Sequence, residues 1–172
     1  MIWNTLKTKL NSGNIIRYHT CPHIGNGQNV AEHTWKAMAI MVSLYEPIDY
    51  GKALLYLLFH DVAEIEFGDL PATTKWDYPR LAKNLNTLER TFEEKLGLPV
   101  YYDDLTEKEH RISKICDLLE LIIHSKKQIN IGNCYAKATY NKGISKIQEL
   151  YSTYPEYTPV KKLLEEIQNE QT

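Results

Sequence analysis

Residues 53–64 read Ala-Leu-Leu-Tyr-Leu-Leu-Phe-His-Asp-Val-Ala-Glu, and this stretch decides the fold. Its first seven residues are apolar all round a helix, which indicates a helix buried at the centre of the molecule. His60, Asp61 and Glu64 follow at spacings that put them on roughly one helical face. Because two carboxylates and an imidazole are costly to bury without a partner, the stretch predicts a divalent metal ion beside them.

Further helices are predicted on both sides of this segment. The central helix is expected to start after an Asp49 N-cap and to end near Gly68. The other helices are expected at about 2–10, 29–45, 79–96, 106–122, 135–151 and 159–168. No segment alternates with period two, so residues 1–172 are predicted to form one all-α domain of about six or seven helices.

Local signals mark several of these helix ends. Asn29 is the expected N-cap of the second helix, with Glu32 three residues later, and Thr106 with Glu109 forms a full capping box. Gly97 is the expected stop of the helix that begins at Pro79.

The composition is that of a globular protein. The 172 residues are 43% hydrophobic and 24% charged, and 20 basic against 22 acidic residues leave a net charge of −2. This balance argues against a general nucleic-acid coat protein, and no apolar run is long enough to span a membrane. No signal peptide is visible. The three cysteines form no CxxC pair, which favours reduced thiols and a cytoplasmic location.

More metal ligands must come from outside the central helix, and two candidates stand out. His33 lies in the first turn of an otherwise apolar helix, and Asp117 lies inside the apolar run Ile115–Leu119. Taken alone, such a histidine is more often a surface or hydrogen-bonded residue, and such an aspartate more often bonds a neighbouring helix end. The order His, His-Asp, Asp at sites of expected burial favours a metal centre. Imidazole and carboxylate ligands suit Zn²⁺, Mn²⁺, Fe²⁺ or Co²⁺.

Five stretches together resemble a known family. They are Arg17-Tyr18-His19-Thr20, residues 29–35 (Asn-Val-Ala-Glu-His-Thr-Trp), 59–64 (Phe-His-Asp-Val-Ala-Glu), 68–75 (Gly-Asp-Leu-Pro-Ala-Thr-Thr-Lys) and 114–117 (Lys-Ile-Cys-Asp). In this order they resemble the HD-domain metal-dependent phosphohydrolases. The most similar branch is the compact one that includes bacterial 5′-deoxynucleotidases and phage-type dATP triphosphohydrolases.

The resemblance implies one metal ion held by four ligands: His33, His60, Asp61 and Asp117. A six-coordinate Mn²⁺, Co²⁺ or Fe²⁺, or else Zn²⁺, would fit two imidazoles and two carboxylates with room for substrate. Glu64 is the predicted acid/base group, and Asp69 is predicted to orient the attacking water or to protonate the leaving oxygen. From position alone, Glu64 could equally be a solvated helix-end carboxylate, and Asp69 a cap or turn residue.

The resemblance also implies how substrate is held. Arg17, Lys75 and Lys114 are predicted to bind phosphate, whereas by default any single lysine would lie on the surface. Tyr18 is expected to pack on the deoxyribose and to leave no room for a 2′-hydroxyl. The irregular stretch 21–28 is expected to recognise the base. Additional Mg²⁺ would accompany the substrate phosphates.

These predictions favour a cytoplasmic hydrolase of 2′-deoxynucleotides, in the host cytoplasm if phage-encoded. The favoured reaction is release of triphosphate from a dNTP, and dATP is the favoured dNTP; release of phosphate from dNMPs by a 5′-deoxynucleotidase is the alternative. A non-enzymatic helical module with a structural metal, and a cyclic-nucleotide or signalling-nucleotide phosphodiesterase, are the competing classes. We expect a homo-oligomer, a dimer or larger, without nucleic-acid or membrane partners.

Overall fold

A computed structural model describes residues 2–18, 21–46 and 50–169 of the chain. Within these ranges the regular structure is helical apart from one isolated bridge between Ile16 and Asn29, so the all-α prediction is confirmed. His19, Thr20 and the expected N-cap Asp49 lie outside the described residues.

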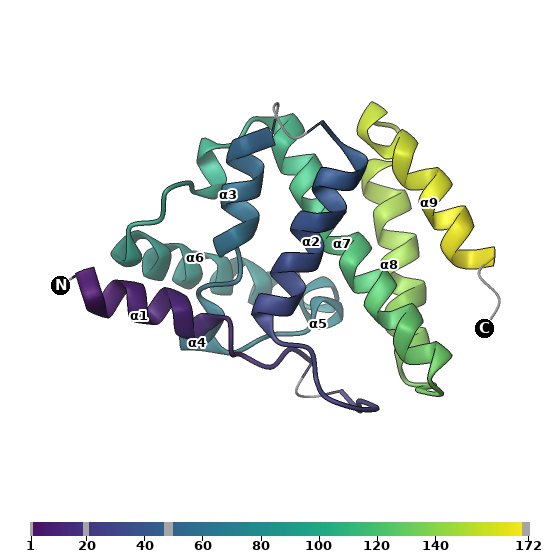
Figure 1. Ribbon diagram of the computed structural model, residues 1–172, viewed down its shortest axis with the longest axis horizontal. Helices are drawn as coiled ribbons and strands as arrows, with labels where there is room; N and C mark the ends of the chain where they lie inside the picture. The colour runs from purple at the N-terminus through teal and green to yellow at the C-terminus, as the bar shows by residue number, and fades with distance from the viewer. Residues whose placement is uncertain (1, 19–20, 47–49, 170–172) are drawn as a thin grey trace.

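The helices are arranged around a central group of three, as Figure 1 shows. Their bounds are α1 Ile2–Ser12, α2 Val30–Leu44, α3 Gly51–Phe59, α4 Glu64–Phe67, α5 Ala72–Asp77, α6 Pro79–Leu96, α7 Glu107–Asn130, α8 Ala136–Tyr151 and α9 Thr158–Asn169. The 3₁₀ turn Tyr102–Asp104 lies between α6 and α7, and the 3₁₀ turn Pro155–Tyr157 lies between α8 and α9. Helices α2, α3 and α7 lie in the middle, α8 and α9 flank them on one side, and α1 and α6 extend on the other (Figure 1).

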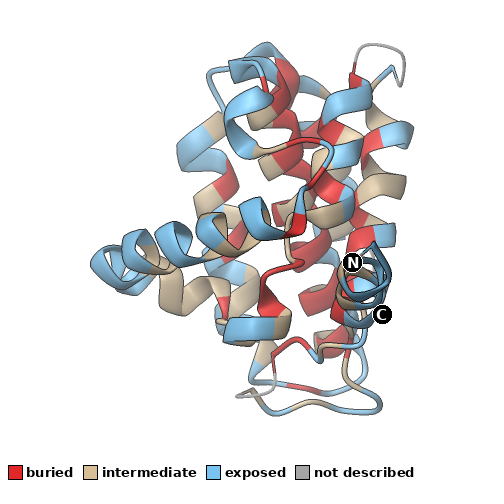
Figure 2. Ribbon diagram, turned by 90° about the vertical axis from the view of Figure 1, so that its left-hand side faces the viewer, coloured by how far each residue is buried: buried red, intermediate tan, exposed pale blue. Residues whose placement is uncertain are grey.

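The long helix α7 is the centre of the core. It packs against α2, α3 and α8, and its Ile112, Ile115, Leu119 and Ile122 are completely buried. Figure 2 shows buried segments running through the middle of the bundle, while its outer helices are largely exposed. Gly143 lets α8 approach closely, because a Cβ atom there would lie 2.9 Å from Ile122 Cγ1. Ile112 belongs to a core cluster with α2 and α3, whereas Ile115, Leu119 and Ile122 belong to a second cluster with α8 and α9, so α7 links the elements that carry the predicted site.

The expected helix ends are largely as the sequence indicates. The Asn29 side chain accepts a 2.8 Å hydrogen bond from the Glu32 amide. Thr106 and Glu109 form the reciprocal capping box that starts α7. Gly97 ends α6 in the left-handed conformation, at φ 58°.

The central helix is shorter than expected, and this prediction is wrong in detail. Helix α3 ends at Phe59, and residues 60–63 form a tight turn before α4 starts at Glu64. His60 Nδ1 lies 2.7 Å from the Leu57 carbonyl oxygen, the group that the next α-helical turn would use as its acceptor. The Glu64 amide instead bonds the Asp61 oxygen three residues back, at 3.1 Å. Residues 72–77, for which no helix was predicted, form helix α5.

Candidate active site

Three predicted metal ligands come together where α2, α3 and α7 meet. His33 of α2, His60 just after α3 and Asp117 of α7 each offer one atom, and these atoms lie within 4.8 Å of one another. His33 Nε2 is 3.3 Å from Asp117 Oδ1 and 3.4 Å from His60 Nε2. Two imidazole nitrogens and a carboxylate oxygen at this spacing fit the donor set of a divalent transition metal.

Asp61, the fourth predicted ligand, borders this cluster. Its Oδ1 lies 3.3 Å from His60 Nε2, while its Oδ2 accepts a 2.6 Å hydrogen bond from Arg17. Burial alone would raise the pKa of Asp61, but the positive charges of His60 and Arg17 outweigh burial and lower it. Asp61 is therefore a carboxylate beside the cluster. Its role as a ligand remains a prediction.

Glu120 positions His33, and the sequence analysis missed it. His33 Nδ1 donates to Glu120 Oε2 at 2.7 Å, and Gln28 Nε2 donates to the other Glu120 oxygen at 2.6 Å. This bond fixes the tautomer that turns Nε2 toward the cluster, as in many metal-binding histidines. Burial and Arg17 lower the pKa of His33, but its hydrogen bonds to Asp117 and Glu120 raise it to about 9. The missed signal was an acidic residue three positions after Asp117 in the same apolar run.

Glu64 and Arg17 form a second buried group beside the cluster. Glu64 is only 3% exposed, and its Oε2 has no hydrogen-bond partner among the described residues; the same holds for Arg17 Nε. Burial, strengthened by the negative charge of Asp61, raises the pKa of Glu64 to about 10. Native proteins seldom leave such groups unpaired, so both atoms point to a polar molecule that binds here.

Asp69 lines the same site, and its side chain accepts a hydrogen bond from the protein backbone. Its Oδ2 accepts a 2.5 Å hydrogen bond from the Tyr18 amide. Tyr18 is held at φ 56°, a left-handed conformation that is uncommon for a tyrosine. Asp69 therefore stabilises the backbone next to Arg17, and its predicted role in proton transfer is not tested by this contact.

Two cavities meet at Asp61. The inner cavity, about 230 Å³, is lined by Glu64, Asp69 and Asp117 together with apolar residues of α7 and α8. The outer cavity, about 890 Å³, runs along α6. Three lysines line both cavities: Lys75, Lys114 and Lys146. The structure thus brings the two predicted phosphate-binding lysines to the cluster and adds Lys146, which the sequence analysis did not single out.

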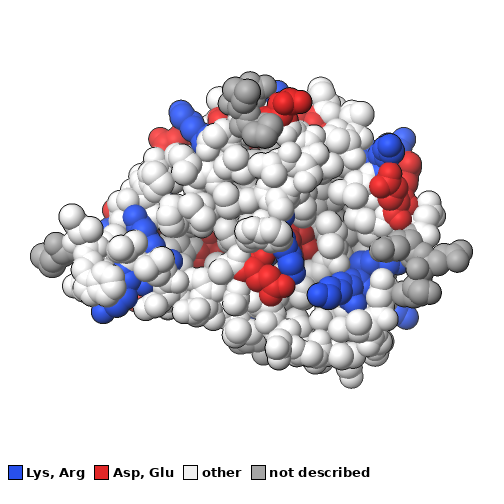
Figure 3. All heavy atoms as spheres, viewed as in Figure 1, with Lys and Arg blue, Asp and Glu red and all other residues white. Residues whose placement is uncertain are grey.

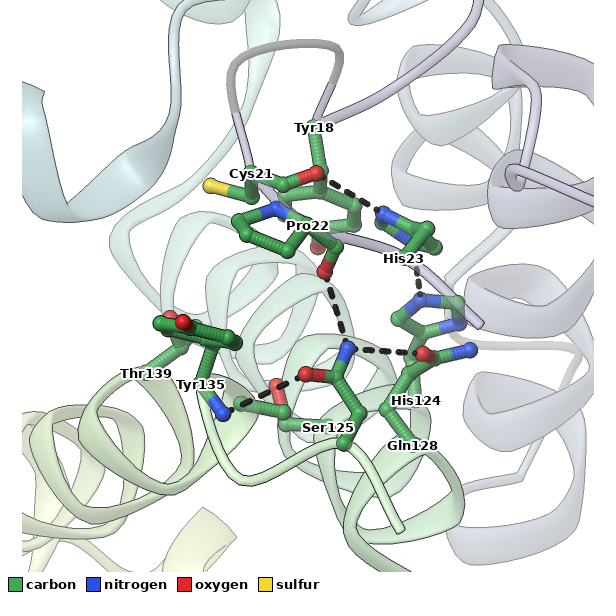
Figure 4. Close-up of a pocket in the computed structure, with 11 residues that line it drawn as sticks. Tyr18, Cys21, Pro22, His23, His124, Ser125, Gln128, Tyr135 and Thr139 are labelled. Carbon is green, nitrogen blue, oxygen red and sulfur yellow. Dashed lines mark hydrogen bonds between the residues drawn. The ribbon is translucent and has the colours of Figure 1, made fainter. Parts of the chain in front are cut away.

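Tyr18 lines neither of these two cavities. Its ring stacks on His124 and His23, at centroid distances of 5.4 and 5.8 Å, and lines a third cavity of about 230 Å³ (Figure 4). Cys21, Pro22 and His23 line the same cavity, and Asn133 Nδ2 donates to the Pro22 carbonyl at 2.8 Å. The predicted contacts of Tyr18 with deoxyribose and of residues 21–28 with the base remain predictions.

The charged side chains of the surface and the polarity of the helices bear on the predicted partners. Figure 3 shows basic and acidic side chains in separate small groups on the face it presents, without a continuous basic area. Among the described residues, every helix is too short or too polar to cross a bilayer.

Solved structures of known proteins share the fold of this chain. A cyanophage S-2L HD phosphohydrolase (DatZ), solved with dA and one catalytic Zn²⁺ ion, has a TM-score of 0.72 at 18% identity, covering 95% of this chain and 96% of that one. An HD-domain phosphohydrolase from Listeria innocua has a TM-score of 0.78 at 21% identity, covering 99% and 90%. The protein PH0347 from Pyrococcus horikoshii has a TM-score of 0.72 at 17% identity, covering 96% and 97%. At these identities the likeness shows the fold.

Comparison with curated proteins gives no match. The family model described as 5′-deoxynucleotidase YfbR-like matches residues 14–169, nearly the whole chain. The predicted resemblance to the HD-domain phosphohydrolases is thus confirmed. With its histidine–aspartate cluster in place and its sequence matched over that length, the chain belongs to the YfbR-like 5′-deoxynucleotidase family, which makes it a deoxynucleotide phosphohydrolase.

Proposed function

We propose that this enzyme hydrolyses 2′-deoxynucleotides at the bond between phosphorus and the 5′ oxygen. The favoured reaction converts dATP to deoxyadenosine and triphosphate. The alternative, release of phosphate from dNMPs, has equal support from the family and from the neighbouring structures. The observation that carries the proposal is the meeting of a metal-ligand cluster, two buried polar atoms without partners, and three lysines in one place.

The proposed metal centre is a single ion bound by His33, His60, Asp61 and Asp117. Mn²⁺, Co²⁺, Fe²⁺ or Zn²⁺ would fit these ligands. When bound, such an ion supplies Lewis acidity at a phosphoryl oxygen and lowers the pKa of water. Glu120 holds His33 in the ligating tautomer, and the Leu57 carbonyl does the same for His60.

The remaining steps fall to the chain's own residues. Glu64 accepts a proton from the attacking water as the water oxygen bonds to phosphorus. The bond from phosphorus to the 5′ oxygen breaks, and the proton passes to that leaving oxygen. Only the ionised form of Glu64 can accept a proton, and burial raises its pKa to about 10 in the absence of metal. A divalent ion bound beside Glu64 would favour the ionised carboxylate and so make it available as the base. In this proposal Asp69 orients the water.

Phosphate charge is balanced by cations from three parts of the chain. Arg17 carries an unpaired Nε at the site, and Lys75 and Lys114 line both cavities. Lys114 Nζ is 3.3 Å from Asp117 Oδ2, so it already balances one acidic side chain of the cluster. Additional Mg²⁺ would accompany the longer phosphate chains.

A substrate screen with product analysis tests the proposal. The enzyme is assayed with dAMP, dATP, AMP and ATP in Mn²⁺, Co²⁺, Zn²⁺ and Mg²⁺, and nucleoside, orthophosphate and tripolyphosphate are resolved. Intact tripolyphosphate from dATP supports the favoured reaction. Orthophosphate from dAMP with dATP untouched establishes the alternative, and turnover of no deoxynucleotide refutes the proposal.

We also propose a cytoplasmic homo-oligomer. Helix α1 exposes Ile2, Trp3 and Leu10 by 86%, 64% and 63%, which is an apolar surface that a second copy could cover. Light scattering after size-exclusion chromatography measures the mass, and a monomer at micromolar concentration would contradict the proposal.

A further inference from the structure

The two cavities that meet at Asp61 differ in charge. Five basic side chains line the outer cavity against three carboxylates: Lys75, Lys83, Arg90, Lys114 and Lys146 against Asp61, Glu89 and Glu93. The inner cavity has four of each sign: Arg17, Lys75, Lys114 and Lys146 against Asp61, Glu64, Asp69 and Asp117. The outer cavity is therefore the electropositive one, although the chain as a whole carries a net charge of −2.

Two carboxylates of the outer cavity, Glu89 and Glu93, have raised pKa values and so carry less negative charge than exposed carboxylates would. Burial, strengthened by its neighbour Glu89, raises the pKa of Glu93 to about 7. Glu89 lies 3.8 Å from Lys75 Nζ, and burial raises its pKa too. Both effects increase the net positive charge that a ligand in this cavity would meet.

The cavities also differ in size and polarity. The inner one is the smaller, and much of its wall is apolar, formed by Leu118 and Leu121 of α7 and by Leu150 of α8. The outer one is nearly four times larger and adds the polar side chains of Asn86 and Thr87. A nucleoside suits the first environment, and a chain of phosphates suits the second.

We propose that a deoxynucleotide lies across the metal cluster, with its nucleoside in the inner cavity and its outer phosphates in the outer cavity, where Lys83 of α6 binds them. This inference rests on the proposed function and goes further, because it assigns an outer-phosphate site to α6 and so favours polyphosphate substrates. Lys146 of α8 also lines both cavities.

Lys83 is the cation available for this role. Among the described residues it has no carboxylate within ion-pair distance, whereas Arg90 is bound by Glu94 at 3.0 Å and by Asp103 at 2.7 Å. Lys83 follows Pro79 by one helical turn, so both lie on the cavity side of α6. A cation without a partner at the wall of an electropositive cavity is suited to an anionic ligand.

The principal test reverses the charge of Lys83. In Lys83→Glu, the ratio of kcat/KM for dATP to that for dAMP should fall by about tenfold, the order expected for losing one charge-assisted contact and adding a repulsive one. Binding of inorganic tripolyphosphate, measured by calorimetry without turnover, should weaken by a similar factor. Lys83→Arg should retain most of both. Lys95→Glu is the matched control, because it makes the same charge change on α6 outside the cavity.

A second variant tests the orientation. Leu150→Trp should fill the inner cavity, lowering kcat/KM for dAMP and dATP alike while leaving tripolyphosphate binding as in the wild type. Weaker tripolyphosphate binding in Leu150→Trp with unchanged hydrolysis would show the opposite orientation. An unchanged dATP to dAMP ratio in Lys83→Glu would overturn the outer-phosphate site while the hydrolase activity stood. Failure of the wild type to hydrolyse either substrate would instead refute the proposed function.

Discussion

The buried polar groups of the site form two halves: in one, nearly all polar atoms have hydrogen-bond partners, and in the other, several do not. In the half between α2 and α7, His33 and Glu120 use both ring nitrogens and both carboxylate oxygens in contacts of 3.5 Å or less, although the Gln28 amide oxygen lacks a partner. In the half beside Asp61, Arg17 and Glu64 keep buried atoms without partners. In the first half, hydrogen bonds within the protein fix the orientation of His33. In the second half, the unpaired atoms of Arg17 and Glu64 would gain partners from a bound molecule.

The largest expected effect comes from removing the predicted ligands His60 and Asp61. His60→Ala and Asp61→Ala should each lose stoichiometric metal and measurable activity. Each also leaves buried polar neighbours unpaired, which should cost about 1–3 kcal/mol of stability without metal. Metal analysis and urea unfolding measure these effects, with the exposed Asp77→Ala as control. Full metal content in Asp61→Ala would remove Asp61 from the ligand set.

Glu64→Ala changes only the half beside Asp61. It should keep its metal and lose about 10²–10⁴-fold in kcat, the usual contribution of general acid–base catalysis. Single-turnover kinetics together with metal analysis test this. A near wild-type rate would move the proton-transfer role to Asp69.

Lys75→Ala and Lys114→Ala test the cations that serve both cavities. Charge-assisted hydrogen bonds of about 1.5–3 kcal/mol correspond to losses of roughly 10–150-fold in kcat/KM. If the natural substrate is a triphosphate, the loss should be larger for dATP than for dAMP. Equal losses on both substrates would favour the 5′-deoxynucleotidase reaction.

Glu120→Gln tests the hydrogen bonding in the half between α2 and α7. The amide keeps the size of the side chain but removes the negative charge that orients His33, so metal affinity should fall by about 10–100-fold. At saturating metal, kcat should recover most of the wild-type value. Competition with a fluorescent chelator measures the affinity, and unchanged affinity would show that Glu120 only fills space.

The smallest effect concerns the third cavity. Burial lowers the pKa of His124 from 6.5 to about 4, with His23 adding to the shift. Between these values the unfolded chain binds the proton and the folded one does not, so stability should fall as pH drops from 6.5 to 4, by about 1–2 kcal/mol after allowing for partial exposure. Unfolding of His124→Gln at pH 7 and pH 5 should show a smaller decrease than the wild type. An equal decrease would place the titration elsewhere.

The helix ends and the lysines of the site differ in how well the sequence predicts them. Helix ends marked by Asn29, Thr106 and Gly97 were predictable because capping depends on neighbours in the chain. The end of α3 was not, since it depends on the His60 side chain bonding a backbone carbonyl. Lys146 was also missed, because its place beside Asp61 depends on how α8 packs on α7.

The close contact between Gly143 and Ile122 has a consequence for substrate size. A methyl group at position 143 would lie 2.9 Å from Ile122 Cγ1, so either that side chain or α8 would have to move. Lys146 and Leu150 lie on the same helix and line the inner cavity. The absence of a side chain at Gly143 thus sets how closely α8 approaches α7, and with it the width of the inner cavity that we propose for the nucleoside.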